Sequence, residues 1–308
     1  MKKYLFIILC LINTTFAFDN GYLTNTTIDY NQYDRYESTT DNEAIAFNGS
    51  MGIYEAKNPP SCCRELPRVV NKKLSSPQDI KIFKTKNIEP ISYTNTVSLN
   101  KLQVSEKKQK FFYMLLPAIL ISKQRLKAKR DRVEHIINND NPTAEEIAFL
   151  DELYKTYETS DNQELLSRMK THPVSIILAQ AAIESAWGES RFFKEGNNIF
   201  GMWSYNANEP RIRAKKTRNG KAVYVRKYAT LSDAIDDYFE VIGRGAYKNF
   251  RKQRDITKDP LKLVEYLVNY CELKEQYTKK LKKFIIANKL EKFDDYKIDR
   301  EYLITKNF

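Results

Sequence analysis

The amino-acid sequence predicts a mostly helical α+β domain with one small β-hairpin. Apolar residues recur at helical spacing in several stretches between residues 105 and 290, each bounded by capping or helix-breaking residues. Segment 211–227 loses that spacing and contains Asn219-Gly220, a dipeptide typical of two-residue hairpin turns. We therefore expect a helical lobe with a β-hairpin flap beside a cleft.

Length and composition agree with one folded domain and additional material. The chain has 308 residues, of which 42% are hydrophobic, and a formal net charge of +12. That length suits a domain of about 150 to 200 residues with further segments. The positive charge favours an anionic partner such as nucleic acid, an anionic membrane or an anionic polymer, and a lysine-rich solubilising surface explains it equally well. No RNP-like, Walker or zinc-spacing motif is present, so we expect no nucleic-acid partner, no metal and no cofactor.

The first 17 residues have the pattern of a secretory signal peptide. Lys2 and Lys3 precede an apolar run over residues 4–12, and Thr15-Phe16-Ala17 forms a small-x-small cleavage site. Cys10 follows Leu9, where a lipoprotein signal would carry a small residue. We expect export to the periplasm or cell envelope of a bacterium, without a transmembrane anchor after cleavage.

Residues 18–104 are predicted to form a polar, weakly ordered N-terminal arm and linker, and residues 105–308 the folded domain. Three cysteines remain after cleavage of the signal: Cys62, Cys63 and Cys271. An odd number excludes a complete disulfide framework. A bridge from Cys271 to Cys62 or to Cys63 and free buried thiols both remain open.

The helices expected before residue 172 follow from apolar spacing and capping residues. Residues 107–138 predict a long buried helix kinked at Pro117, and its apolar run 111–121 is too short to span a membrane. Thr143 with Glu146, and Asp161 with Glu164, have the spacing of capping boxes, so a helix is expected to start after each pair.

The later elements are predicted by the same signals. Pro173 is expected at the first position of a central helix, where its missing N–H costs nothing. Ile212-Arg213 and Val223-Tyr224-Val225 are the expected strands of the hairpin. Further helices are predicted over 232–242, with Ser232 as the cap, and over 260–269 and 275–290.

Glu184 is the carboxylate that suggests catalysis. The central helix is apolar nearly all round, so it should be buried, and burial raises the pKa of a carboxyl group. A carboxyl group that stays protonated near neutral pH suits a general acid for glycosidic cleavage. The alternative is a structural role, in which Glu184 pairs with Arg191 or caps a neighbouring segment.

The motif around Glu184 resembles a known family. The stretch AQAAIESAWGESRF (179–192), followed by EGNNIFGMW (195–203), is similar to the core signature of the bacterial glucosaminidases of glycoside hydrolase family 73, most of all its Bax-type members. The resemblance covers roughly residues 105–290. It implies a lysozyme-like fold and hydrolysis of the β-1,4 bond after N-acetylglucosamine in peptidoglycan, whose glycan strands would be the partner.

The resemblance also implies roles for single residues. Glu184 falls on the family's general acid and Tyr228 on an aromatic position near it, while Asn198, Phe200 and Gly201 fall on a wall of the cleft. A loop cap, core packing and a tight turn are the structural alternatives for those three residues. The predicted substrate-binding residues are Trp187, Asn198, Phe200, Gly201, Trp203, Tyr205 and Tyr224.

The second catalytic group is not evident from the sequence. Family members often carry a Glu in the flap, but residues 211–226 contain no Asp or Glu. Glu209 is the nearest candidate, and an ordinary loop residue is its alternative. Without a second carboxylate, assistance by the substrate's 2-acetamido group and a lytic transglycosylase reaction remain open. A catalytically silent wall-binding module and a binder of anionic surfaces are the non-enzymatic alternatives. The oligomeric state is not predicted.

Overall fold

The computed structural model of this protein describes residues 63–218 and 220–307. The predicted signal peptide and the arm up to residue 62 lie outside the described residues. Within the described residues no helix is both long and apolar enough to cross a membrane.

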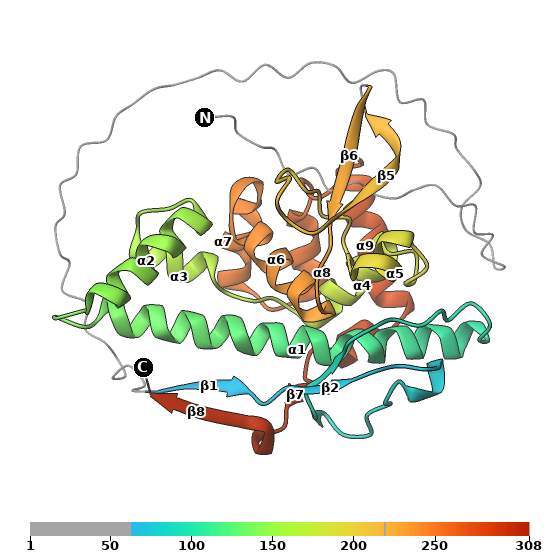
Figure 1. The fold of residues 1–308 in the computed structure, drawn as a ribbon, viewed down its shortest axis with the longest axis horizontal. Helices are drawn as coiled ribbons and strands as arrows, with labels where there is room; N and C mark the ends of the chain where they lie inside the picture. The colour runs from blue at the N-terminus through green and yellow to red at the C-terminus, as the bar shows by residue number, and fades with distance from the viewer. Residues whose placement is uncertain (1–62, 219, 308) are drawn as a thin grey trace. The chain divides into compact units, whose positions relative to one another are not determined.

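Helix α1 (Val104–Ile137) is the element on which the others pack. It has 34 residues and includes Pro117, as the apolar spacing predicted. Residues 111–121 are buried apart from Tyr113. Figure 1 shows α4 to α9 on one side of α1 and the strands β1 and β8 on the other.

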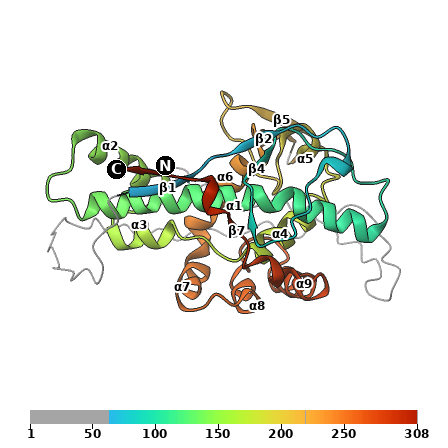
Figure 2. The same cartoon turned by 90° about the horizontal axis from the view of Figure 1, so that it is seen from below.

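Short strand pairs join the two ends of the described chain. Strand β1 (Cys63–Pro67) runs antiparallel to β8 (Leu303–Asn307), and Figure 2 shows this pair along α1. Two parallel pairs also form, β2 (Val70–Lys72) with β4 (Ile91–Tyr93) and β3 (Asn87–Ile88) with β7 (Lys297–Ile298).

The prediction of a weakly ordered linker is wrong for residues 63–104. This segment contains β1 to β4 and a short 3-10 helix, η1 (Pro77–Asp79), and it buries Leu74, Ile80 and Tyr93. Strands β1 and β3 pair with residues far away in the sequence, such as Leu66 with Ile304. The segment therefore has no local periodicity that a sequence pattern could reveal.

The helices before the central segment start where their caps predicted. Helix α2 (Ala144–Tyr157) has a complete capping box between Thr143 and Glu146. At α3 (Asn162–Arg168) the side chain of Asp161 accepts a hydrogen bond from the backbone N–H of Glu164. Helix α4 (Val174–Glu184) begins one residue later than expected, with Pro173 as its cap.

The hairpin lies where the Asn-Gly turn predicted it. Strands β5 (Arg211–Arg218) and β6 (Lys221–Arg226) are antiparallel, with Ile212 opposite Val225. Helix α5 (Arg191–Gly196) precedes the hairpin, and α6 (Leu231–Gly243) follows it. Thr230, not Ser232, caps α6, because its hydroxyl accepts the N–H of Asp233.

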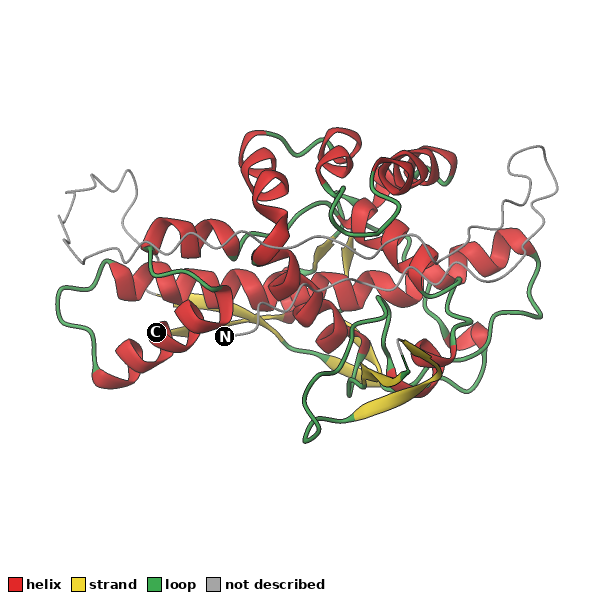
Figure 3. Ribbon diagram, turned by 90° about the horizontal axis from the view of Figure 1, so that it is seen from above, coloured by secondary structure: helices red, strands yellow, loops and turns green. Residues whose placement is uncertain are grey.

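The C-terminal part is helical. It consists of η2 (Gly245–Tyr247), α7 (Lys248–Ile256), α8 (Pro260–Leu263), η3 (Val264–Tyr266), α9 (Glu275–Ala287), η4 (Leu290–Phe293) and η5 (Arg300–Tyr302). The predicted fold class is confirmed, since helices dominate the described chain and strands occur only in short pairs (Figure 3).

The N-terminal end of α4 is held by a carboxylate from the other end of the chain. Asp294 accepts hydrogen bonds from the backbone N–H of Ser175 at 2.7 Å and from its hydroxyl at 2.8 Å. A negative group at this end of a helix also interacts favourably with the helix dipole. Asp294 thereby fixes the start of the helix that ends at Glu184.

We expect Asp294→Ala to lower the free energy of unfolding by about 1 to 3 kcal/mol, because it leaves a backbone N–H of α4 without its acceptor. The neighbouring Asp295→Ala is the matched control. Within the described residues Asp295 forms a single, exposed ion pair with Lys86, so its loss should change stability by less than about 0.5 kcal/mol. Urea unfolding of both variants measures the difference, and equal stabilities would contradict this role of Asp294.

Candidate active site

Glu184 is the last residue of α4, and its side chain is buried, with 2% exposure. Burial raises the pKa of its carboxyl group to about 8, while a hydrogen bond from Tyr277 and the charge of Lys280 act in the opposite direction. The carboxyl group is therefore protonated at neutral pH, as the apolar surroundings of the helix predicted.

The chain reverses direction directly after Glu184. Ala186, Trp187 and Gly188 have φ values of 52°, 60° and 81°, so three successive residues adopt the left-handed conformation. Such backbone is costly for Ala and Trp, and it persists only where the surroundings hold it. The Ser185 hydroxyl accepts the N–H of Gly188 at 2.9 Å, and the N–H of Trp187 donates to Ala182. This turn ends α4 at the carboxylate.

Tyr277 of α9 contacts the carboxyl group of Glu184. Its hydroxyl donates a hydrogen bond of 2.9 Å to Glu184 Oε1, and its oxygen accepts one of 3.3 Å from Gln180 Nε2. The Oε1 atom of Gln180 accepts a hydrogen bond of 2.6 Å from the hydroxyl of Tyr238. All four side chains are buried.

His172 is the far end of this hydrogen-bond chain. Its Nε2 atom lies 2.8 Å from the oxygen of Tyr238, and Tyr238 already uses its proton toward Gln180. Nε2 must therefore carry the proton that Tyr238 accepts. Burial and the charges of Arg254 and Lys123 hold the pKa of His172 well below its usual value, so the ring is neutral. Every hydrogen bond in the chain that leads from His172 through Tyr238, Gln180 and Tyr277 to Glu184 then has a fixed donor and a fixed acceptor.

Aromatic packing fixes the rings of this chain. Tyr270 stacks on Tyr277 with ring centroids 5.5 Å apart and 13° between the ring planes. Phe200 stacks on Tyr238 at 4.5 Å. Phe200 is fully buried, so it supports the hydrogen-bond chain from within the core.

The loop over residues 198–203 contacts the hairpin through hydrogen bonds. The amide nitrogen of Asn198 donates to the carbonyl oxygens of Met202 and Arg226, and its Oδ1 accepts the N–H of Met202. Gly201 has a φ of 68°, which favours glycine. Trp203 forms a β-bridge with Val225. The polar atoms of Asn198 thus bond to the protein's own backbone.

The remaining predicted aromatic residues lie in two places. Trp187 packs on α1 and α9, with its ring 5.4 Å from Phe112 and 5.3 Å from Phe284. The others belong to the hairpin region, where the Arg218 guanidinium lies over Trp203, that of Arg211 lies over Tyr224, and Tyr205 is close to Trp203.

Tyr228 and Glu209 belong to a separate polar cluster around Asp237. The hydroxyl of Tyr228 donates to Asp237 Oδ2 at 2.5 Å, and Arg226 donates to Oδ1 at 2.6 Å. Arg226 Nε lies 3.6 Å from Glu209 Oε1. These four residues line a cavity of about 330 Å³, and Glu184 is not among its lining residues. Tyr277, rather than Tyr228, is the tyrosine that the structure places on Glu184.

Other carboxylates near the central helix form ion pairs with lysine or arginine. Glu189 forms an ion pair with Lys194 at 2.5 Å. Arg191 pairs with Glu195 at 3.0 Å and also donates to the carbonyl oxygen of Arg213, which argues against Arg191 as the partner of Glu184. Glu272, which the sequence pattern did not single out, lies between Tyr270 and Tyr277 in the chain and pairs with Arg218 of the hairpin at 3.2 Å.

Metal ligation and the state of Cys271 are two further chemical features of the described chain. Within residues 63–218 and 220–307, no group of three His, Cys, Asp or Glu side chains is arranged to hold a metal ion. Cys271 is buried and disulfide-bonded. Cys62 lies outside the described residues, so the choice between Cys62 and Cys63 as the partner of Cys271 stays a prediction.

The helical segment that contains the buried Glu184 is similar to known proteins. Residues 160–290 match the glucosaminidase family model, described as mannosyl-glycoprotein endo-beta-N-acetylglucosaminidase. The matched segment includes Glu184, Tyr277 and the hairpin.

Two curated relatives agree with the family model. The exo-glucosaminidase LytG of Bacillus subtilis is 31% identical over 87 residues, which are 27% of this chain and 31% of LytG. The protein bax of Escherichia coli is 30% identical over 94 residues, 29% of this chain and 31% of bax. The matched region thus spans about a third of each relative's length.

Solved structures with similarity to this chain include two cell-wall enzymes. The catalytic domain of the autolysin Auto from Listeria monocytogenes has a TM-score of 0.35 and 19% identity, covering 54% of this chain and 97% of that domain. A peptidoglycan hydrolase from Sphingomonas sp. A1 has a TM-score of 0.33 and 24% identity, covering 47% of this chain and 91% of the other.

The raised pKa of Glu184 predicts a pH-dependent effect of Glu184→Gln on stability. The folded state binds this proton more tightly than the unfolded state, so the stabilising contribution is complete below about pH 4.5 and is lost as pH rises to about 8. Glutamine does not ionise. The variant should therefore gain stability relative to the wild type across that interval, by up to about 1.4 kcal/mol per pH unit.

Denaturant unfolding of both proteins from pH 4 to pH 9 measures this gain. Glu195→Gln is the control, because Glu195 is exposed and its removal should give a difference that barely changes with pH. A pH-independent difference for Glu184→Gln would show that the carboxyl group titrates normally.

Proposed function

We propose that this protein is a peptidoglycan hydrolase that cleaves the β-1,4 bond after N-acetylglucosamine, with Glu184 as the general acid. The observation that carries the proposal is the buried Glu184 carboxyl group, with its pKa near 8, inside a glucosaminidase-family segment. Its relatives include an exo-glucosaminidase. A protonated carboxyl group at neutral pH is what protonation of a glycosidic oxygen requires.

Tyr277 orients the acid in this proposal. Its hydroxyl donates to Oε1 of Glu184, which leaves Oε2 to carry the transferable proton. After transfer, the same hydrogen bond stabilises the carboxylate, because it favours the charged form. Gln180, Tyr238 and His172 hold Tyr277 in the donating orientation and are positioning residues.

Three candidates remain for the second catalytic group: the carboxylate of Glu209, the carboxylate of Glu272 and a group of the substrate itself. Glu209 is paired with Arg226 in the Asp237 cluster, whereas Glu272 is on the loop before Tyr277 and contacts the hairpin. Hairpin residues 211–218 and 220–226 contain no Asp or Glu. That absence keeps two further reactions as alternatives, participation of the 2-acetamido group and attack by the muramic 6-hydroxyl in a lytic transglycosylase reaction.

A catalytically silent wall-binding module is the second candidate function. The same lack of a hairpin carboxylate favours it, as does the 2% exposure of Glu184. Such a module would bind sacculi without releasing muropeptides. Export to the cell envelope follows from the proposed substrate and from the predicted signal peptide.

The purified protein should clear peptidoglycan sacculi, and Glu184→Gln should reduce the rate about 10²- to 10⁴-fold because it removes the general acid. Glu195→Gln should retain the wild-type rate. Retained clearing by Glu184→Gln would refute the role of Glu184, and binding without clearing by the wild type would support the silent module.

Mass spectrometry of the products distinguishes the bond and the reaction. We expect reducing N-acetylglucosamine ends. Reducing muramic ends would identify cleavage of the other glycosidic bond, and 1,6-anhydro ends would identify a lytic transglycosylase. Loss of activity in Glu272→Gln but not in Glu209→Gln would point to Glu272 as the second group, and the reverse result to Glu209.

Tyr277→Phe should lower kcat/KM about tenfold, since one hydrogen bond to a charged group contributes roughly 1.5 kcal/mol or more. It should also move the alkaline limb of the pH profile upward, because the hydroxyl no longer lowers the pKa of Glu184. A pH series of hydrolysis rates measures both effects.

Tyr270→Phe is the matched control for this variant. Tyr270 is buried beside Tyr277, and its hydroxyl has no hydrogen-bond partner among the described residues. Its removal should leave the pH profile unchanged. Identical profiles for the two variants would contradict the orienting role of Tyr277.

A further inference from the structure

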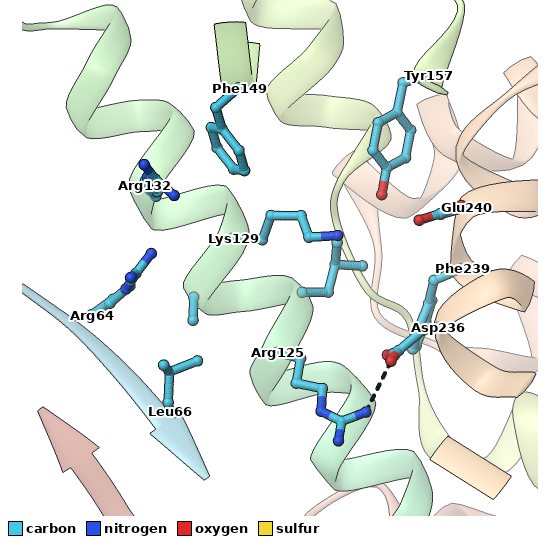
Figure 4. A pocket seen from close by; sticks show the side chains of 12 residues that line it. Arg64, Leu66, Arg125, Lys129, Arg132, Phe149, Tyr157, Asp236, Phe239 and Glu240 are labelled. Carbon is cyan, nitrogen blue, oxygen red and sulfur yellow. Dashed lines mark hydrogen bonds and ion pairs between the residues drawn. The ribbon is translucent and has the colours of Figure 1, made fainter. Parts of the chain in front are cut away.

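A second cavity lies along α1, away from Glu184. It has a volume of about 350 Å³ and is formed by β1, the second half of α1, α2 and α6 (Figure 4). We call it the α1 pocket. Its lining residues are Arg64, Leu66, Arg125, Leu126, Ala128, Lys129, Arg132, Phe149, Tyr157, Asp236, Phe239 and Glu240. Most of them precede residue 160, where the glucosaminidase match begins.

The hydroxyl of Tyr157 is a buried polar group without a partner. Tyr157 is the last residue of α2, its side chain is 1% exposed, and no hydrogen bond to its hydroxyl forms within the described part of the chain. Figure 4 shows the hydroxyl directed into the pocket. A buried donor left unpaired costs about 1 to 3 kcal/mol, so it requires an explanation, and a ligand acceptor supplies one.

Positive charge in the α1 pocket is only partly compensated. Arg125 pairs with Asp236 at 3.0 Å and with Asp233 at 3.3 Å. Across residues 63–218 and 220–307, neither Lys129 nor Arg64 forms an ion pair, and Arg64 Nε is buried without a hydrogen-bond partner.

Arg132 is the third cation of the pocket, after Lys129 and Arg64, whose charge is not strongly compensated. Its guanidinium is 3.5 Å from Glu145, whose side chain is 87% exposed, and such exposed pairs contribute little. The guanidinium also lies 4.3 Å from the ring centroid of Phe149.

The acidic residues of the pocket do not balance these cations. Asp236 already accepts hydrogen bonds from Ser122 and Arg125. Burial raises the pKa of Glu240, and Lys129 acts in the opposite direction. With Asp236 paired to Arg125, Glu240 alone faces Arg64, Lys129 and Arg132, so the pocket is positive overall.

The pocket also offers apolar surface. Leu66 of β1, Leu126 of α1, Phe149 of α2 and Phe239 of α6 line it. A cavity with aromatic and aliphatic walls and a few convergent polar groups is typical of a small-molecule site.

We propose that the α1 pocket binds a small amphiphilic oxyanion, a carboxylate or phosphate carried on an aromatic or aliphatic body. The anionic group would contact Lys129, Arg64 and Arg132. The hydroxyl of Tyr157 would donate to an oxygen of the ligand, and the body would pack on Phe149 and Phe239. This site is separate from Glu184 and does not depend on the proposed hydrolase activity.

Calorimetric titration of the purified protein tests the proposal with three probes. N-Acetyl-phenylalanine is the carboxylate, phenyl phosphate the phosphate, and N-acetyl-phenylalaninamide the neutral control. We expect at least one of the two anions to bind with a Kd of about 1 mM or tighter, and the amide at least about tenfold more weakly. The anion that binds more tightly shows whether the pocket prefers a carboxylate or a phosphate.

Two variants locate the binding site. Lys129→Met should weaken anion binding about tenfold, and Tyr157→Phe, which keeps the ring, should weaken it several-fold. Lys127→Met and Tyr154→Phe are the matched controls. Lys127 pairs with Asp131 and is exposed, and the hydroxyl of Tyr154 bonds to Asn162. Both controls should bind as the wild type does.

Three results would overturn the proposal. These are no saturable binding of either anion up to about 10 mM, equal binding of the amide, and anion binding unchanged in both Lys129→Met and Tyr157→Phe. Thermal melting verifies that each variant folds. Clearing of sacculi by the two pocket variants should match the wild type, so failure here is distinguishable from failure of the proposed function.

Discussion

The burial of the Glu184 carboxyl group is the constraint on which the rest of the site depends. A carboxyl group enclosed in this way stays protonated at neutral pH, provided that its neighbours do not offer a compensating cation. Helix α4 meets this condition because it is apolar and buried nearly all round and ends at Glu184 with a left-handed turn. The neutral phenol of Tyr277 donates a hydrogen bond to Oε1, which orients the carboxyl group without ionising it.

That orientation is built from several parts of the chain. The hydrogen-bond chain from His172 to Glu184 joins His172, two residues before α4, with α6, α4 itself and α9. Its directions are consistent because His172 is neutral and each tyrosine has a single proton to donate. Stacking by Phe200 and Tyr270 prevents the rings from turning.

Helix α1 connects this site with the α1 pocket. Its first half supplies Phe111 and Phe112, which pack against Trp187 just after the acid. Its second half lines the pocket with Arg125, Lys129 and Arg132. Strand β1, which pairs with β8 from the other end of the described chain, packs on the same helix. One element thus supports an apolar core at one end and a positively charged cavity at the other.

The sequence by itself determined the features that depend on neighbouring residues. Helical spacing and caps placed α1, α2 and α4 to within a few residues, Asn219-Gly220 placed the hairpin, and the motif around Glu184 identified the family segment. The tertiary structure alone decided that residues 63–104 are ordered, that Tyr277 and not Tyr228 contacts Glu184, and that Arg64 and Tyr157 share a cavity. Those contacts join residues far apart in the chain. They depend on how the helices and strands pack, so no periodic pattern within a short stretch of sequence reveals them.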